Sequence, residues 1–452
     1  MIGKAKKAFK ILRTRGLSGF YRQLLWKKYL IGWNRRYQDW IKEYDTLTNE
    51  DVSEMKRLIA DLSNRPLISI LMPVYNVDEK WLRRALESVI DQAYPHWEFC
   101  IADDCSTRQH VRRVLEEYAS RDKRIKVVFR EQNGHISAAS NSALELTTGE
   151  YTVLLDHDDE LAKHALFMVA LAVTSDPKID MIYSDEDLID HRGRRYFPKF
   201  KPDWSPDLLC SMNFVTHLSV YRTQILKDMG GFTIGREGSQ DYDVALRFSE
   251  RIPAENICHI PHVLYHWRAI SGSVALASDE KSYAHGRARE AIDSHFERSS
   301  IRATSIPGFG ELHRTIYELP EPQPLVSIVI VVGEQTDAEK AVKILERTDY
   351  KPFELILVSG GAITLTSNDN VVKVLEHRKG SSFELLNEAV RESSGSVVCF
   401  LDGSTAIKRR DWLVEAVATA IQPHIGCVGG KVLFPDNRIK HAGLIMGVGN
   451  GV

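Results

Sequence analysis

The stretch LISILMPVYN, at Leu67–Asn76, runs from apolar β-branched residues into a polar turn. WEFCIADDCS at Trp97–Ser106 and IKVVFR at Ile125–Arg130 have the same texture, and EYTVLLDHDDE at Glu150–Glu160 ends in a cluster of acidic residues. We predict that each stretch is a β-strand that leads into a loop. Because the segments between them have helical spacing, their order predicts a doubly wound, mostly parallel α/β sheet.

Two of the intervening segments place apolar residues three and four positions apart, as on one face of a helix. These residues are Leu82, Ala85, Leu86 and Val89 in the first segment, and Val111, Val114, Leu115 and Tyr118 in the second. Ligands of such sheets bind outside the carboxyl ends of the strands. We therefore expect Pro73, Tyr75, Asp103, Asp104 and the loop at Asp156–Asp159 to converge on one crevice.

The acidic loop after the fourth strand offers three carboxylates, from Asp156, Asp158 and Asp159. Neighbouring carboxylates repel one another unless a positive group lies between them. Hard oxygen ligands suit Mg²⁺ or Mn²⁺, held together with the phosphates of a substrate. A phosphate-binding loop of the GxxxxGK[ST] type does not occur in the sequence. The alternative is that Asp158 or Asp159 caps a helix beginning near Leu161.

Composition excludes several classes of protein. The 452 residues are 43% hydrophobic and 27% charged, with a net charge of −2, which gives no general attraction to nucleic acid. Six cysteines without a CxxC pair predict reduced thiols in a cytoplasmic protein. No apolar run approaches the roughly 20 residues of a membrane-spanning helix, and the N-terminus lacks the features of a signal peptide. We expect a protein that stays inside the cell.

The N-terminal region, residues 1–64, is basic and has helical spacing. Its apolar positions form two sets, Leu17, Phe20, Tyr21, Leu24 and Leu25, and then Tyr37, Trp40, Ile41 and Tyr44. Lysines, arginines and aromatic residues on such helices suit peripheral contact with an anionic membrane. The alternative is an arm that packs on its own domain or on a partner subunit.

The chain also contains an internal repeat. After the linker at residues 319–324, PLVSIVIVV at Pro324–Val332 resembles PLISILMPV at Pro66–Val74, and the spacing from Asn387 to Asp402 equals that from Asn141 to Asp156. We predict a first domain at residues 65–318 and a partial second domain at residues 325–452. Because the second repeat stops before a full domain is complete, we expect a longer natural chain.

The motifs ISILMPVYN, IADDCS, NGHISAASN and LLDHDDE, in this order, resemble family 2 glycosyltransferases of the GT-A fold. The nearest resemblance is to bacterial tandem-domain enzymes of surface-polysaccharide assembly. It is strong over Pro66–Ala275 and weaker over Pro324–Val452. The resemblance implies a Rossmann-like GT-A domain followed by a second, degenerate one.

The resemblance also implies roles for the residues of the crevice. Pro73 and Tyr75 would line the pocket for the nucleotide base, and Asp104, with Asp103 beside it, would accept a hydrogen bond from the base. The nucleotide sugar would also contact Asp156 and Asp158. A metal ion, Mn²⁺ or Mg²⁺, would be held by Asp158, Asp159 and His266.

On the acceptor side the resemblance implies that Asp241 is the general base, with helix capping as its alternative. A glutamine, Gln240, stands where the family has a glutamate. The remaining residues of this side are Asp185, Trp204 and Arg268. Loop stabilisation is an equal alternative for Asp185 and Trp204, and Trp204 could simply pack.

The function implied is that of an inverting, metal-dependent glycosyltransferase that extends a bacterial cell-surface glycan such as O-antigen or capsule. Its partners would be a nucleotide-sugar donor and a glycan or lipid-linked acceptor at the inner membrane face. One alternative is a sugar nucleotidyltransferase, although its GxGTRL loop does not occur. The other is a non-catalytic glycan-binding or scaffold module, which suits the second repeat, where Asp402-Gly403-Ser404 replaces the acidic motif.

Overall fold

The computed structural model describes residues 32–269, 282–333 and 338–443, the last range with gaps at 340, 344–346, 360, 362, 364–371 and 377–381. The chain forms two compact units. The first unit comprises Met1–Ser299 and Ser305–Arg314, and the second comprises Ser300–Thr304 and Thr315–Val452. Among the described helices, none has both the length and the apolarity needed to cross a bilayer.

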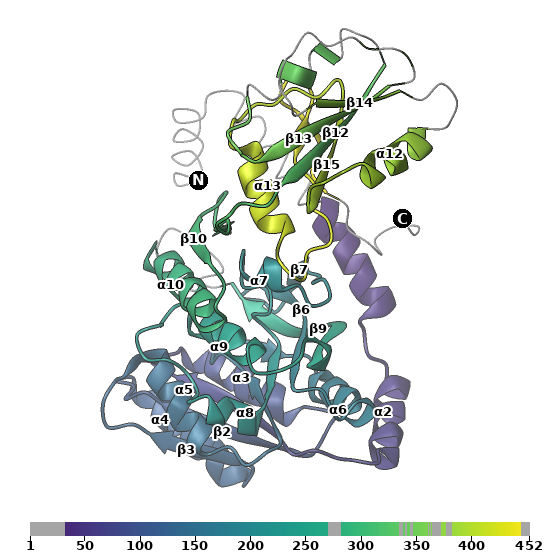
Figure 1. Cartoon of the computed structure of the whole chain (residues 1–452). Helices are drawn as coiled ribbons and strands as arrows, with labels where there is room; N and C mark the ends of the chain where they lie inside the picture. Colours follow the sequence, from purple (N-terminus) through teal and green to yellow (C-terminus); the bar gives the residue numbers. More distant parts are fainter. Residues whose placement is uncertain are drawn as a thin grey trace, which may run out of the picture. The chain divides into compact units, whose positions relative to one another are not determined.

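The first half of the first unit is a parallel sheet (Figure 1). Its strands lie side by side in the order β3 (Ile125–Phe129), β2 (Trp97–Asp103), β1 (Ile68–Val74) and β4 (Tyr151–Leu154). All three pairings are parallel, so the carboxyl ends of β1, β2 and β4 meet at one edge. The predicted α/β fold class is confirmed for this part of the chain.

The second half of the same sheet is mixed. Beyond β4 it continues with β8 (Ser219–Arg222), β6 (Met181–Ile189), β9 (Ile257–Arg268) and β5 (Glu160–Leu161), and β7 (Arg195–Lys199) pairs with β6. The β4–β8, β8–β6 and β9–β5 pairings are antiparallel, whereas β6 and β9 are parallel. This half supplies residues that pack beside the acidic loop.

Helices cover both faces of the sheet. The described helices of the first unit are α2 (Asn49–Asp61), α3 (Glu79–Ile90), α4 (Gln109–Arg121), α5 (His135–Glu145), α6 (Ala165–Ser175), α7 (Pro206–Leu209), α8 (Thr223–Asp228), α9 (Gln240–Ser249) and α10 (Ser282–Arg298), together with a helix at residues 32–44. One apolar cluster joins Ile68, Ile70 and Met72 of β1 to α3, α4 and α6. Because successive strand residues alternate in direction, Ser69 and Leu71 face the opposite side, where α5 packs on β1 and β2.

The helix at residues 32–44, called here the N-terminal helix, packs on the first unit through its aromatic residues. Trp33 contacts Phe197 with ring centroids 5.6 Å apart, and Trp40 contacts Phe200 at 5.3 Å. Tyr37 is 4% exposed, whereas Tyr44 is 65% exposed. Tyr37 and Trp40 therefore pack on the chain's own domain. The earlier apolar set, from Leu17 to Leu25, lies outside the described residues.

The second unit repeats the strand order of the first. Its strands β14 (Val372–Glu376), β13 (Phe353–Ser359), β12 (Val326–Val332) and β15 (Val397–Asp402) form an all-parallel sheet in that order. Its other labelled elements are α12 (Ser382–Arg391), α13 (Trp412–Ala420) and the two-stranded sheet of β16 (Val432–Leu433) and β17 (Ile439–His441). The chain also forms a two-stranded sheet of β10 (Ala303–Pro307) and β11 (His313–Tyr317), at residues where the division between the units falls. The repeat seen in the sequence is thus a repeat of topology.

A buried carboxylate ties the strands of the first unit together. Glu98 on β2 accepts hydrogen bonds from Ser69 Oγ at 2.6 Å, Lys126 Nζ at 2.6 Å and the backbone N–H of Gly149 at 3.1 Å. Thr148 Oγ1 donates a further bond at 2.8 Å. Although burial alone would raise it, these donors lower the pKa of Glu98 to about 2. A paired, ionised carboxylate thus joins β1, β2, β3 and the turn before β4.

The second unit contains the same arrangement. Glu354 on β13 accepts from Ser327 Oγ at 2.6 Å and from the backbone N–H of Ser394 at 2.6 Å, and its other oxygen lies 3.2 Å from Lys373 Nζ. Gly395 N–H donates to Ser327 Oγ at 2.9 Å, as Gly149 N–H does to Ser69 Oγ. The two units therefore share a pattern of hydrogen bonds as well as a strand order.

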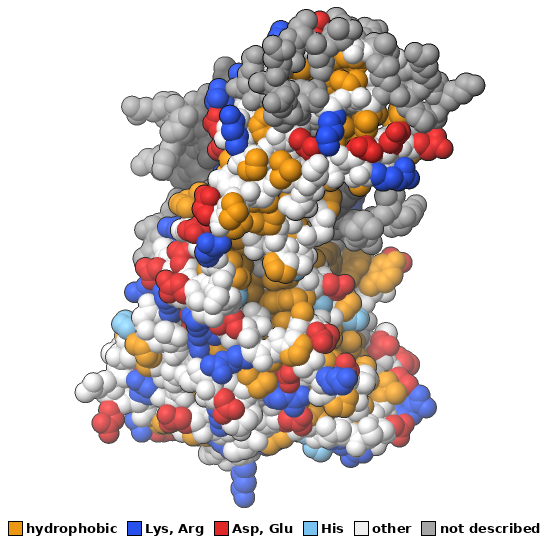
Figure 2. Space-filling view, in the orientation of Figure 1, with side chains coloured by type: hydrophobic (Ala, Val, Ile, Leu, Met, Phe, Trp, Pro, Cys, Tyr) orange, Lys and Arg blue, Asp and Glu red, His pale blue; other side chains and the backbone are white. Residues whose placement is uncertain are grey.

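Acidic and basic side chains are interspersed over the face of the first unit in Figure 2. Two ion pairs join helices α3 and α4: Arg83 with Glu117 at 2.8 Å and Arg113 with Glu79 at 2.7 Å. Such half-exposed pairs contribute little stability individually.

Candidate functional site

The carboxyl ends of β1, β2 and β4 bring the predicted crevice residues to one edge of the sheet. Val74 pairs with Asp103, and Asp104 N–H donates to the Val74 carbonyl at 2.8 Å. His157 Nδ1 in the acidic loop donates to the Pro73 carbonyl at 3.1 Å. Polar loops from three strands therefore lie side by side, as the sequence predicted.

Asn76 holds the loop after β1 against the loop after β2. Its φ of 46° is left-handed, a conformation that asparagine tolerates better than most residues. Its Oδ1 accepts hydrogen bonds from Thr107 N–H at 2.9 Å and Arg108 N–H at 3.0 Å. Tyr75, the preceding residue, is 44% exposed. The fixed loop leaves the Tyr75 ring accessible at the rim of the crevice.

Asp103 and Asp104 differ in their hydrogen-bond partners. Asp104 Oδ1 accepts from Arg130 Nε and from Gly134 N–H, each at 2.9 Å. Asp103 is 4% exposed, and its Oδ1 has no partner among the described residues. Burial, with Asp104 adding to it, raises the pKa of Asp103. In this arrangement Asp103 Oδ1 remains an acceptor for a further donor.

Asp159 is the fully buried member of the acidic loop. Its Oδ2 accepts from Tyr265 Oη at 2.7 Å, and its Oδ1 accepts from Arg268 N–H at 2.6 Å. Burial first, and then the charges of Asp158 and Asp156, raise the pKa of Asp159 well above its usual value. A nearby cation would be needed to keep this carboxylate ionised.

Arg268, predicted on the acceptor side, lies beneath the acidic loop. It is 1% exposed, and its Nε donates to the Asp158 carbonyl at 2.7 Å. Its guanidinium also pairs with Glu160 and lies 4.3 Å from the centre of the Trp81 ring. Through these contacts Arg268 holds the acidic loop in place.

His217, which the sequence analysis did not single out, lies beside the loop. Ligand atoms of Asp156, Asp159 and His217 all lie within 4.8 Å of one another. The His217 ring stacks on Tyr265, with centroids 4.4 Å apart. Burial lowers the pKa of His217 to about 4, so its imidazole is neutral at pH 7 and keeps a lone pair for a cation. Two carboxylates and a neutral imidazole form a donor set that could hold a divalent metal ion.

A buried ion pair positions His217. Glu186 is fully buried and lies 2.6 Å from Lys199 Nζ and 3.3 Å from Lys201 Nζ. It also accepts from Thr216 Oγ1 at 2.7 Å and His217 N–H at 3.1 Å. Although burial would raise it, the two lysines hold the pKa of Glu186 well below its usual range. The ionised carboxylate therefore anchors the segment that carries His217.

The predicted ligand His266 is on β9, where it pairs with Glu160 of β5. Its Nδ1 donates to Asp187 Oδ1 at 2.6 Å. Asp185, two residues before Asp187, contacts His259 Nε2 at 2.9 Å and accepts from Lys201 N–H at 2.8 Å. Asp185 is thus engaged within the fold.

Asp241, the predicted base, is in the first turn of α9 and is partly buried. Burial raises the pKa of Asp241, and Asn213 Nδ2 donates to its Oδ2 at 2.8 Å. Gln240 folds back to accept from Gly238 N–H at 2.8 Å. Asp243 is buried and paired with Arg247 at 2.7 Å. Asp241 is therefore better suited than Asp243 to accept a proton.

Trp204 belongs to an aromatic group. Its ring lies 6.4 Å from Tyr183 and 6.0 Å from Phe214, and Tyr183 stacks on His259 at 4.9 Å. These contacts agree with the packing alternative for Trp204.

The second unit presents its counterpart of the acidic loop differently. Asp402 is exposed, and Ser404 N–H donates to its Oδ1 at 2.8 Å. Hydrogen bonds from Ser404 lower the pKa of Asp402. This carboxylate is a solvated turn residue.

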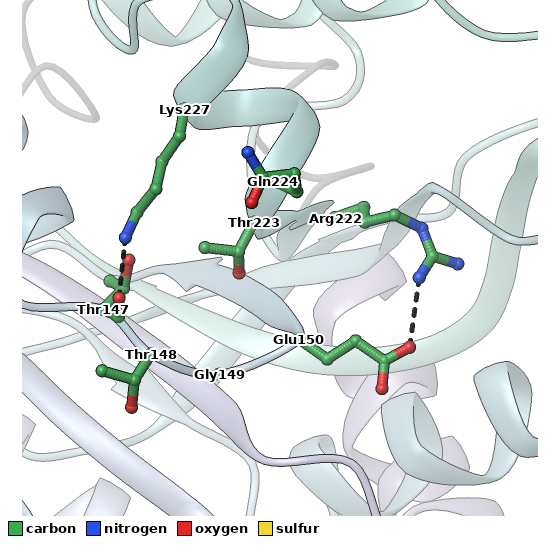
Figure 3. Close-up of a pocket in the computed structure, with 8 residues that line it drawn as sticks. All are labelled: Thr147, Thr148, Gly149, Glu150, Arg222, Thr223, Gln224 and Lys227. Atoms are coloured by element: carbon green, nitrogen blue, oxygen red, sulfur yellow. Dashed lines mark hydrogen bonds and ion pairs between the residues drawn. The ribbon is translucent and has the colours of Figure 1, made fainter.

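A surface hollow of about 280 Å³ lies at the other end of β4 (Figure 3). Its lining includes Thr147, which accepts from Lys227 Nζ at 2.7 Å, and Glu150, which pairs with Arg222 at 3.1 Å. Both cations are satisfied by the chain itself. Because residues 147–150 precede β4 and the acidic loop follows it, this hollow is separate from the crevice.

Comparison with known proteins gives a family match within the first unit. Residues 69–230 match the model of the family described as Glycosyl transferase family 2. The matched range contains β1, β2, β4 and the acidic loop.

Two longer proteins are similar to most of the chain. An uncharacterized protein, y4gI, of Sinorhizobium fredii is 41% identical over 87% of this chain and 45% of its own length. The O-antigen biosynthesis protein RfbC of Myxococcus xanthus is 34% identical over 88% of this chain and 32% of its own length. The chain thus spans less than half the length of these relatives. A solved structure of Staphylococcus aureus TarS 1–349 with UDP has a TM-score of 0.37 and 23% identity, covering 51% of this chain and 72% of that one.

Proposed function

We propose that the first unit is an inverting, metal-dependent glycosyltransferase, because its residues 69–230 match the model of glycosyl transferase family 2. It would move a sugar from a nucleotide-sugar donor to a growing bacterial cell-surface glycan. The observation that carries the proposal is the grouping of Asp156, Asp159 and His217 at the edge where β1 and β2 also end.

A divalent cation fits this site by the chemistry of its donors. Asp156, Asp159 and His217 offer ligand atoms, and Asp158 and His266 are the further ligands predicted from the sequence. Asp159 supports the fit, because its buried carboxylate needs a positive neighbour to stay ionised. Mn²⁺ or Mg²⁺ supplies charge neutralisation for a diphosphate leaving group. The crevice residues Pro73, Tyr75, Asp103 and Asp104 would hold the base of the donor.

In the transfer step, Asp241 takes the proton of the acceptor hydroxyl. The hydroxyl oxygen forms a bond to the anomeric carbon from the face opposite the diphosphate. The bond between that carbon and the diphosphate oxygen breaks, and the diphosphate leaves with the electron pair. The raised pKa of Asp241 supports this role, because a base near the operating pH accepts a proton more readily.

The acceptor would be a glycan or a lipid-linked glycan at the cytoplasmic face of the inner membrane. One support is the name of the Myxococcus relative, an O-antigen biosynthesis protein. The other supports are the basic residues before position 32 and six cysteines that are all free thiols. The second unit, whose Asp402 is exposed, would act as a non-catalytic module.

The proposal is tested by thermal unfolding of the full chain with UDP, GDP or dTDP, each with Mn²⁺ or with excess chelator. A nucleotide at about 100 times its Kd adds roughly 2.7 kcal/mol to the free energy of unfolding. We expect one nucleotide to raise Tm only when metal is present, and Asp156→Asn to abolish that rise. Equal stabilisation in chelator would contradict metal dependence, and no stabilisation by any nucleotide would contradict the function.

A further inference from the structure

Asp187 on β6 is a buried carboxylate with three side-chain donors. Tyr37 Oη, Arg195 Nε and His266 Nδ1 each lie 2.6 Å from one of its oxygens. The Asp187 side chain has no exposed surface, so these donors replace the water that an exposed carboxylate would bind. The three come from different elements: the N-terminal helix, β7 and β9.

Tyr37 is connected to this carboxylate as both donor and acceptor. Its hydroxyl donates to Asp187 and accepts from Arg195 Nη2 at 3.1 Å, and Arg195 also pairs with Asp45 at the end of the N-terminal helix. Gln38 Nε2 donates to the Arg195 carbonyl at 2.6 Å. The N-terminal helix is therefore bound to β7 at the point where β7 reaches Asp187.

Asp187 in turn fixes His266. A carboxylate that accepts from Nδ1 keeps the proton of the neutral imidazole on that nitrogen and leaves the lone pair on Nε2. Carboxylates of this kind orient histidine ligands in metal sites. On either side of His266 in β9, Tyr265 and Arg268 bond to Asp159 of the acidic loop. β9 therefore connects His266 along its backbone to the acidic loop.

We propose that Tyr37 is a positioning residue of the glycosyl-transfer site, which acts from the N-terminal helix through Asp187 on the tautomer and orientation of His266. The role of His266 in that site rests on the proposed function. Packing alone does not explain Tyr37, because a phenylalanine would fill the same space beside Trp40 and Phe200. The hydroxyl is the part that reaches the carboxylate.

The test compares Tyr37→Phe with Tyr44→Phe in the full chain. Tyr44 is on the same helix but 65% exposed, so its variant controls for the loss of a hydroxyl. Histidine is labelled with ¹⁵N, and the His266 ring signals are identified by their loss in His266→Gln. In the parent we expect a protonated Nδ1 and an unprotonated Nε2. In Tyr37→Phe we expect these signals to move toward the average of the two tautomers, and in Tyr44→Phe we expect no change. Asp187→Asn should move them further.

Binding of Mn²⁺ alone, followed by electron paramagnetic resonance, is the second measurement. We expect Tyr37→Phe to weaken it by roughly tenfold, the lower end of the effect of losing an outer-shell partner. Unchanged His266 signals in Tyr37→Phe would overturn the proposal, even if Tm fell, because the hydroxyl would then only support packing. Moved signals with unchanged Mn²⁺ affinity would overturn it as well, because His266 would then lie outside the metal site that Tyr37 is proposed to position. Failure of every nucleotide to bind would overturn the proposed function and leave the tautomer result intact.

Discussion

At Asp241 the environment favours a carboxylate that can accept a proton. It is partly buried, its pKa is raised by burial, and it accepts a hydrogen bond from Asn213. We expect Asp241→Asn to lower the transfer rate by roughly 10²–10⁴-fold, the usual contribution of general-base catalysis. The affinity for the nucleotide should not change, because asparagine has nearly the same size. Turnover and nucleotide Kd are measured together.

The matched control for Asp241→Asn is Asp402→Asn, in the exposed loop of the second unit. It should leave the transfer rate unchanged. Near-normal turnover in Asp241→Asn would mean that another group is the base. The rate of the parent should also rise as the pH increases through the raised pKa of Asp241, because only the ionised form accepts a proton.

His217 provides a second prediction at the scale of a single residue. Its neutral imidazole lies with Asp156 and Asp159, so His217→Gln should remove a nitrogen ligand. We expect the affinity for Mn²⁺ to fall by at least about tenfold, since even an outer-shell substitution costs 10–100-fold. His191→Gln, at an exposed position, is the control. Equal Mn²⁺ affinity in the two variants would exclude His217 from the site.

Among the elements, β2 carries the buried carboxylate Glu98, which is held by Ser69 and Lys126. Its pKa is lowered from 4.5 to about 2, so the folded state binds its proton less readily than the unfolded state. The resulting stability is present above pH 4.5 and is lost as the pH falls toward 2. This contribution of Glu98 to the free energy of unfolding is on the order of 3 kcal/mol.

We therefore expect Glu98→Gln to lower the free energy of unfolding at pH 7 and to flatten its dependence on pH between about 5 and 2. Urea unfolding at several pH values measures both effects. Glu116→Gln is the control, because Glu116 forms a surface pair with Arg112 in which both side chains are more than half exposed. If the free energy of unfolding depended on pH in the same way in both variants, the hydrogen bonds of Glu98 would not be the source of this stability.

The elements also show what the sequence could predict. The local apolar patterns of β1, β2 and β4 predicted that Asp103 and Asp156 lie at the same edge of the sheet, because parallel strands end on the same side. His217 was missed because it reaches that edge through the antiparallel pairing of β8 with β4, about 70 residues apart in the chain. Tyr37 was read only as an apolar position, since its partner Asp187 is 150 residues away. Local periodicity carries no information about such contacts.

At the scale of the whole molecule, the charge of the segment before the N-terminal helix predicts binding to a membrane surface. Residues 1–31 contain nine lysines and arginines and no acidic residue. Near an anionic membrane each basic residue contributes about 1 kcal/mol, and salt screens this attraction within a Debye length of about 10 Å at 0.1 M. We expect a chain that begins at residue 32 to bind vesicles containing anionic lipid more than about 100-fold more weakly than the full chain.

The truncation at residue 32 keeps Tyr37 and its contact with Asp187, so nucleotide-dependent stabilisation should be the same in both chains. The measurement is co-sedimentation with vesicles of phosphatidylcholine with and without phosphatidylserine, at low and high salt. The difference between the chains should appear only with the anionic lipid and should shrink at high salt, because the attraction is electrostatic. Unchanged partitioning of the truncated chain would assign these basic residues a role other than membrane contact. A loss of nucleotide stabilisation would show that they act on the first unit itself.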